Sequence, residues 1–155
     1  MTVRRAVAAD TPGLVRLLRQ VLEVHHAGRP DLFRTGVRKY TDDQLAALLR
    51  DPDRPVFVAV EGDAVQGYAF CVLQSTAGSP MLTDIRTLYI DDLCVDETVR
   101  GRHVGRTLYE FVVAYARAQG CYNVTLNVWA CNPAAMRFYE AMGMRPQKIG
   151  METVL

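Results

Sequence analysis

The feature that most constrains the fold is an apolar stretch, residues 85–95, that leads into a basic, glycine-containing loop and then into a helical pattern. Apolar residues after the loop recur at helical spacing, namely Val104, Leu108, Phe111, Val112, Tyr115 and Ala116. Residues 122–129 then read as another strand. A strand, a helix and a second strand in this order predict a right-handed parallel crossover within one sheet.

The remaining elements follow from caps and apolar periodicity. The predicted order is strand, two helices, three strands, helix, strand, helix and a terminal strand. Asp10 or Thr11 caps the first helix, and a capping box at Thr41 and Gln44 begins the second. The expected ranges are 2–6 for the first strand, 11 to about 28 and 42–51 for the two helices, 55–60 and 64–74 for an antiparallel hairpin, 133–142 for the last helix, and 144–155 for one or two final strands.

Length and charge exclude several classes of protein. A chain of 155 residues fits one domain, and 18 basic against 17 acidic residues leave no global field for nucleic acid or an anionic membrane. The four cysteines form no C-x-x-C pair, so we expect neither a metal site nor disulfides. There is no run of about 20 apolar residues and no signal-peptide pattern, and we predict a cytoplasmic protein with reduced thiols.

The loop between the long strand and its helix has the composition of a phosphate cradle. Gly101 and Gly105 allow close backbone approach, and the first N–H groups of a helix have no partners inside it. Arg100, Arg102 and Arg106 add positive charge. The alternative is an ordinary turn, because glycines serve turns as well and the segment is neither a P-loop nor a full G-x-G-x-x-G fingerprint.

Two signatures resemble the GNAT superfamily of N-acetyltransferases. The segment 100–105, RGRHVG, is similar to the family's [RQ]-x-x-G-x-[GA] loop, with His103 where the family has its first glycine. Residues 132–144 resemble the family's N-x(6)-Y-x-x-x-G-[FM] ending. The resemblance implies a single α/β (α+β) domain over residues 1–155, with a mixed, mostly antiparallel sheet flanked by helices. It also implies acetyl-CoA as cosubstrate.

Two adjacent acids in the long strand, Asp91 and Asp92, resemble the pair in spermidine/spermine and related small-amine acetyltransferases. By this resemblance Asp91 is the base that acts through water, and Asp92 holds a cationic substrate. Strand alternation sends the two side chains to opposite faces unless a bulge intervenes. The alternative is a pair that simply faces solvent.

The resemblance also implies roles for residues around the cosubstrate. Tyr139 is the predicted general acid, with a core aromatic as the alternative. Asn132 is expected to cap the last helix and to meet the amide arm of the coenzyme. Cys94 has no local His base and is not expected to be a nucleophile. The predicted cosubstrate-binding residues are Leu93, Cys94, Val95, Arg100, Gly101, Arg102, His103, Val104, Gly105, Arg106, Asn132 and Tyr139.

The sequence therefore predicts transfer of an acetyl group from acetyl-CoA directly to a primary amine of a small molecule. The alternatives are a non-catalytic acyl-CoA sensor, a nucleotide-binding module, or acetylation of a peptide or protein amino group. The loops at 29–40 and 75–83 are expected to choose the acceptor, with His25 and His26 as candidates to line its pocket. A homodimer through the terminal residues Ile149, Met151, Val154 and Leu155 is also considered, against packing of these residues on their own chain.

Overall fold

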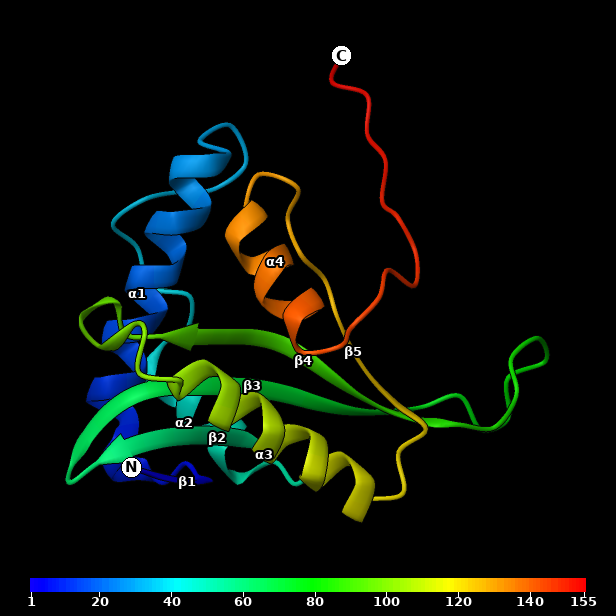
Figure 1. Ribbon diagram of the computed structural model, residues 1–155, viewed down its shortest axis with the longest axis horizontal. Coiled ribbons are helices and arrows are strands. Elements are labelled where there is room, and N and C mark those ends of the chain that lie inside the picture. The colour runs from blue at the N-terminus through cyan, green and yellow to red at the C-terminus, as the bar shows by residue number, and fades with distance from the viewer.

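The computed structural model describes all 155 residues, which build one five-stranded sheet with helices on both faces (Figure 1). The strands lie in chain order from β1 to β5; the first four are antiparallel neighbours, and β4 and β5 are parallel. The predicted mixed, mostly antiparallel sheet is confirmed. The elements are β1 (Thr2–Arg5), α1 (Thr11–Gly28), α2 (Asp42–Arg50), β2 (Val56–Glu61), β3 (Ala64–Ser75), β4 (Arg86–Val95), α3 (Val104–Ala118), β5 (Asn123–Leu126) and α4 (Pro133–Ala141), with short 3-10 turns η1 (Ala8–Asp10) and η2 (Glu97–Val99).

The predicted N-terminal cap forms in α2 but not in α1. The predicted capping box of α2 forms, because the Thr41 hydroxyl accepts from the N–H of Gln44 at 3.2 Å and the Gln44 side chain accepts from the N–H of Thr41 at 2.9 Å. Asp10 stands at the N-cap of α1 but does not cap it. Its carboxylate accepts instead from the N–H of Val7 and from the guanidinium of Arg4, which ties β1 to the start of α1.

The two faces of the sheet carry separate cores. On one face α1 and α2 pack on β2 and β3, through buried residues that include Leu14, Leu17, Leu45, Val58 and Tyr68. On the other face α3 packs on the central strands, through Phe57, Leu88, Ile90, Leu108 and Val112. Burial of such side chains from both faces is the main term that holds the sheet between its helices.

The C-terminal end of the chain corrects two predictions. The strand expected over residues 122–129 is only Asn123–Leu126, because β5 stops pairing where β4 and β5 part. The one or two strands expected over residues 144–155 do not form, and no backbone N–H beyond Met144 is hydrogen-bonded within the chain. A strand needs a neighbour, and this segment, hereafter the C-terminal arm, has none in its own chain (Figure 1).

None of the helices has the length and the apolar character needed to cross a lipid bilayer.

Candidate active site

A β-bulge in β4 brings the two acids to one region. Opposite β3, Phe70 pairs with Asp92 and Cys71 pairs with Ile90, so Asp91 is an extra residue without a partner. A bulge of this kind shifts the alternation of side chains by one position. Ile90 packs in the α3 core, whereas the Asp92 carboxylate faces the opposite side of the sheet, toward α1.

Asp92 lies in a largely buried setting. Its Oδ2 accepts from the hydroxyl of Tyr68 at 2.7 Å, and Tyr68 is itself fully buried. Burial raises the pKa of Asp92, although the charge of Lys39, the Tyr68 hydrogen bond and nearby His25 each act to lower it. Burial likewise lowers the pKa of His25. Asp92 is therefore a carboxylate that gains a proton more readily than an exposed one.

Asp91 is more open and is paired. Its Oδ2 lies 3.4 Å from Nζ of Lys39, and the two side chains are 38% and 41% exposed. Burial lowers the pKa of Lys39, but the charges of Asp92 and Asp91 outweigh it and the pKa is raised. The ammonium group of Lys39 therefore lies close to both acids.

Aromatic rings line the same side. His25 stacks on Phe33 with ring centres 4.9 Å apart, and Phe33 meets the edge of Trp129 at 5.1 Å. Tyr40 stacks on Phe70 at 5.9 Å. These rings come from α1, the 29–40 loop, β3 and the segment after β5, and they form two aromatic clusters from residues far apart in sequence.

Beyond Ile90, β4 has a sheet neighbour on one side only. Pairing with β5 ends at Ile90 and Leu126, whereas pairing with β3 continues to Val95. Residues 91–95 therefore expose one backbone edge to the gap that opens between β4 and β5. Unpaired N–H and C=O groups on a strand edge can bind an extended ligand in the way another strand would.

The basic loop ends in three unpartnered backbone donors. The first backbone hydrogen bond of α3 runs from the N–H of Thr107 to the carbonyl of His103. The N–H groups of Val104, Gly105 and Arg106, which precede it, have no acceptor in the chain. Gly101 and His103 both adopt positive φ, at 83° and 60°. Free N–H groups at the start of a helix are a common feature of anion-binding sites.

The three arginines of the loop are exposed. Arg106 lies 3.6 Å from Glu110 one turn along α3, while Arg100 and Arg102 form no ion pair within the chain. Burial raises the pKa of the Cys94 thiol, and the charge of nearby Arg100 opposes part of that rise, which links the loop electrostatically to the end of β4. Positive charge therefore surrounds the open donors of α3.

Helix α4 closes the other side of the gap. Asn132 caps it, accepting from the N–H of Ala135 at 3.2 Å, and so fulfils the predicted capping role. Gly105 allows α4 to approach α3, because a Cβ at this position would lie 3.2 Å from the ring of Phe138. The hydroxyl of Tyr139 makes no hydrogen bond within the chain, and burial, together with Asp92 and Cys94 nearby, raises the pKa of Tyr139.

Cys94 does not have the surroundings of a nucleophile. Burial, together with Asp92, raises the pKa of its thiol to about 12, so the thiolate is scarce at neutral pH. Its Sγ lies 3.8 Å from the carbonyl oxygen of Leu17, within the α1 core. The expectation that Cys94 is not a nucleophile agrees with this setting.

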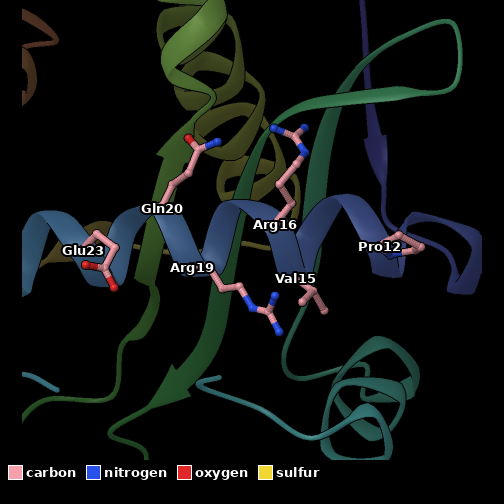
Figure 2. Close-up of a pocket in the computed structure, with 6 residues that line it drawn as sticks. All are labelled: Pro12, Val15, Arg16, Arg19, Gln20 and Glu23. Atoms are coloured by element: carbon pink, nitrogen blue, oxygen red, sulfur yellow. The ribbon is translucent and has the colours of Figure 1, made fainter. Parts of the chain in front are cut away.

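A shallow groove on α1 lies apart from the acidic pair. Figure 2 shows its lining residues, with Arg16 and Gln20 rising from one side of α1 and Arg19 and Val15 from the other. Arg16 binds Asp96, and the Gln20 side chain accepts from the N–H of Glu97 at 3.3 Å. These two side chains hold the turn after β4 in place, so the groove lies over a structural contact between α1 and the end of β4.

The structure gathers most of the predicted residues around the gap between β4 and β5. The residues that the sequence analysis missed are Tyr68, Lys39, Tyr40, Phe33, Phe70 and Trp129. Nδ1 of His26 lies 2.7 Å from the carbonyl oxygen of Phe33, where the ring supports the loop. Only the loop at 29–40, already expected to choose the acceptor, pointed to any of the missed residues.

Comparison with known proteins gives a family and several relatives to which the chain is similar. The family model described as acetyltransferase (GNAT) family matches residues 18–144. Glucosamine 6-phosphate N-acetyltransferase of Arabidopsis thaliana is 27% identical over 115 residues, which are 74% of this chain and 68% of that protein. Thialysine N-epsilon-acetyltransferase of Bos taurus is 26% identical over 151 residues, 91% of this chain and 82% of that one. The X-ray structure of a tetramutant of the BH1408 protein from Bacillus halodurans is 35% identical, covers 100% of this chain and 100% of its own, and superposes with a TM-score of 0.95.

Proposed function

Because the chain belongs to the acetyltransferase (GNAT) family, and is an N-acetyltransferase that depends on acetyl-CoA, we propose that its acceptor is the primary amine of a small cationic molecule and that transfer is direct. The observation that carries the proposal is the gap beyond Ile90, which has the acidic pair on one side and Tyr139 on the other. The two named relatives act, by their names, on glucosamine 6-phosphate and thialysine, and both compounds carry a primary amine.

The residues present fit the coenzyme. Free N–H groups at 104–106 and the unpaired arginines suit its diphosphate, and the open edge at 91–95 suits an extended amide arm. When bound, the coenzyme supplies an acetyl thioester as the activated acyl group. The backbone at Leu93, Cys94 and Val95 is positioned to donate to the thioester carbonyl, and Asn132 retains a free NH₂ for the arm.

We assign proton acceptance to Asp92 and cation binding to Asp91, which reverses the roles suggested by the sequence. An alkylamine has a pKa of about 10.4, so the acceptor must lose a proton before it attacks. The burial and raised pKa of Asp92 support its role as the base. Asp91, which already holds the ammonium of Lys39, supports a role in binding a positive charge.

Tyr139 is the proposed proton donor to the departing sulfur. Its raised pKa keeps the phenol protonated at neutral pH, and its hydroxyl has no competing acceptor within the chain. The new bond joins the amine nitrogen to the acetyl carbon as the carbon–sulfur bond breaks. Asp92 takes the proton that the ammonium group loses before it attacks. Tyr139 gives its proton to the departing thiolate and is reprotonated by the second proton, which the nitrogen loses as the amide forms, so protons and charge balance.

The proposal is tested by coenzyme release from acetyl-CoA with a panel of polyamines, amino acids, aminoglycosides and short peptides. A small amine that carries a second positive charge is expected to give the highest kcat/KM. If peptides are the best acceptors, the small-molecule assignment is wrong. Tight coenzyme binding without turnover on any amine would instead favour a sensor.

Asp92→Asn separates catalysis from folding. The amide oxygen can still accept from Tyr68, so the variant should fold, while kcat/KM falls by about 10²–10⁴-fold because the base is lost. Asp63→Asn, in the exposed turn between β2 and β3, is the matched control and should retain full activity. Unchanged kcat/KM in Asp92→Asn would remove Asp92 from the mechanism.

A further inference from the structure

We propose that Lys39 is a specificity-determining residue that competes with the acceptor: in the free protein its ammonium group occupies the place at Asp91 that the second positive charge of a dicationic acceptor takes. The inference rests on the proposed binding of a cationic acceptor at the acidic pair. It adds the group of the chain that such an acceptor must displace.

The Lys39 ammonium lies among groups that suit an amine. Nζ is 3.4 Å from Oδ2 of Asp91 and 5.3 Å from the centre of the Tyr40 ring. Burial lowers the pKa of Lys39, but the charges of Asp92, Tyr40 and Asp91 outweigh it. His25 on α1 also faces this charge, and its pKa is lowered by burial first and then by Lys39. Carboxylates and aromatic faces both bind ammonium ions, so a primary ammonium of the chain itself already uses this place.

The contact between Lys39 and Asp91 is a weak one. Its 3.4 Å is longer than the distance of about 2.7–2.9 Å usual for a charged hydrogen bond, and the two side chains are 41% and 38% exposed. The pair between Arg4 and Asp10 is different, because two nitrogens meet the carboxylate at 2.8 and 3.0 Å and the Asp10 side chain is only 6% exposed. An exposed ion pair contributes little free energy, so another cation can replace Lys39 at low cost.

The choice of lysine at this position favours exchange. Sixteen of the eighteen basic residues of the chain are arginines, and the two lysines are Lys39 and Lys148. A guanidinium can bind a carboxylate through two parallel N–H groups, whereas an ammonium is a single hydrated charge on a flexible stem. The acidic pair is thus neutralised by the more easily displaced of the two cations.

The backbone around Lys39 is anchored, so the side chain can leave alone. On one side Arg38 binds Asp42, in the first turn of α2, with Nη2 2.8 Å from Oδ1. On the other side the Tyr40 ring stacks on Phe70 of β3 at 5.9 Å. Rotation of the Lys39 stem toward solvent therefore opens Asp91 and disturbs neither the loop nor α2.

This arrangement distinguishes acceptors by their number of charges. A monoamine needs only Asp92, because the Lys39 ammonium continues to neutralise Asp91. A diamine brings a second ammonium that must take the place of Lys39 at Asp91. Lys39 therefore raises the KM of a diamine more than that of a monoamine, and it limits the preference of the site for dications.

Steady-state kinetics with putrescine as the diamine and butylamine as the monoamine test the proposal. Lys39→Met should lower the KM of putrescine by about twofold to fivefold, with little change in kcat and a smaller change for butylamine. Lys39→Arg should raise the KM of putrescine, because a guanidinium held by two hydrogen bonds is harder to displace. Burial raises the pKa of Asp92 and the charge of Lys39 opposes that rise, so rates are compared on the plateau above the acid limb.

Nuclear magnetic resonance on lysine-labelled protein gives a readout without acetyl transfer. Saturation with putrescine in the absence of acetyl-CoA should make the ammonium protons of Lys39 exchange faster with water, because they leave Asp91. Lys148 lies in the C-terminal arm, and its signal should not change. Lys148→Met is the matched control for the kinetics and should leave both KM values as they are.

Three results would overturn the proposal. They are an unchanged KM for putrescine in Lys39→Met, an equal fall in KM for both amines, and unaltered exchange at Lys39 when putrescine saturates the protein. Acetylation of putrescine beside any of them would leave the proposed function standing. If no amine is acetylated, the dissociation constants of putrescine for the wild type and Lys39→Met, measured by the same resonance titration, still decide whether Lys39 competes.

Discussion

The first three quarters of the chain and the last quarter are built differently. All 26 buried residues lie at or before Ala116, and most of them form the cores on the two faces of the sheet. The segment after it supplies β5, α4 and the arm, and it buries none. The acidic pair belongs to the first region and Tyr139 to the second, and they meet at the gap between β4 and β5. Folding stability should therefore reside mainly in the first region, and substitutions in the second should cost less stability.

The largest effect is expected at Tyr139, where a substitution should leave stability unchanged and lower the reaction rate strongly. Tyr139→Phe should lower kcat by about 10²–10⁴-fold if the hydroxyl is the proton donor. Its Tm should not change, because the hydroxyl has no hydrogen bond in the chain to lose. Tyr115→Phe, which packs on Phe57 in the α3 core, is the matched control for activity. Steady-state kinetics beside a thermal melt decides the matter, and unchanged kcat in Tyr139→Phe would remove its acid role.

Two leucines, one in each region, show how much buried packing each region contributes to stability. Leu17→Ala should lower the free energy of unfolding by about 2–5 kcal/mol, because it leaves a cavity in a fully buried site. Leu126→Ala in β5 should cost less than half as much, since its side chain is only partly covered. Urea denaturation of both variants gives the two values. Equal costs would contradict the difference in packing.

Tyr68→Phe tests whether a buried hydroxyl of the first region helps to set the pKa of Asp92. Loss of the hydrogen bond to Asp92 should cost about 1–3 kcal/mol of stability. That bond lowers the pKa of Asp92, so its removal raises the pKa further. A base works only when deprotonated, so the acid limb of the kcat/KM profile should move to higher pH. A limb that stays in place would mean that Asp92 is not the titrating base.

The smallest effect is expected at His103, at the start of α3. His103 occupies the left-handed region at φ 60°, where a side chain is strained. His103→Gly should raise the free energy of unfolding by about 0.5–1 kcal/mol, because relief of left-handed strain, about 1–2 kcal/mol, exceeds the entropy cost of a glycine, about 0.5–1 kcal/mol. It should leave coenzyme affinity equal or improved, because the backbone donors at 104–106 remain. Thermal melts and calorimetry with coenzyme A give both values, and a lower Tm would show that the histidine ring contributes packing.

The sequence predicted those parts of the fold that local signals specify. The capping box at Thr41 and Gln44, the helical periodicity after Val104 and the parallel crossover from β4 to β5 all appear in the structure. The position of Tyr139 beside the gap was also anticipated, because a short motif fixes it on α4. Such features depend on residues close together in the chain.

Features that depend on distant residues escaped prediction. The pattern of apolar residues in a strand is the same whether or not a tyrosine hydroxyl donates to a carboxylate. The sequence therefore did not indicate the contact between Tyr68 and Asp92. Lys39 sits in a loop of irregular structure, and its position over Asp91 follows from the packing of α1 and α2. The terminal strands were predicted wrongly because apolar content indicates a strand without showing which neighbour it has.

The bulge at Asp91 decides which changes of length β4 can accept. Ile90 and Leu93 both pack toward α3, while Cys94 packs toward α1, and this arrangement requires one residue between them that stands outside the alternation. If Asp91 paired regularly with β3, Asp92 would point into the α3 core and Leu93 would leave it. Deleting Asp91 entirely would instead give an uninterrupted ladder with every later side chain on its present face. The same strand can therefore lose one acid by deletion without misplacing the other.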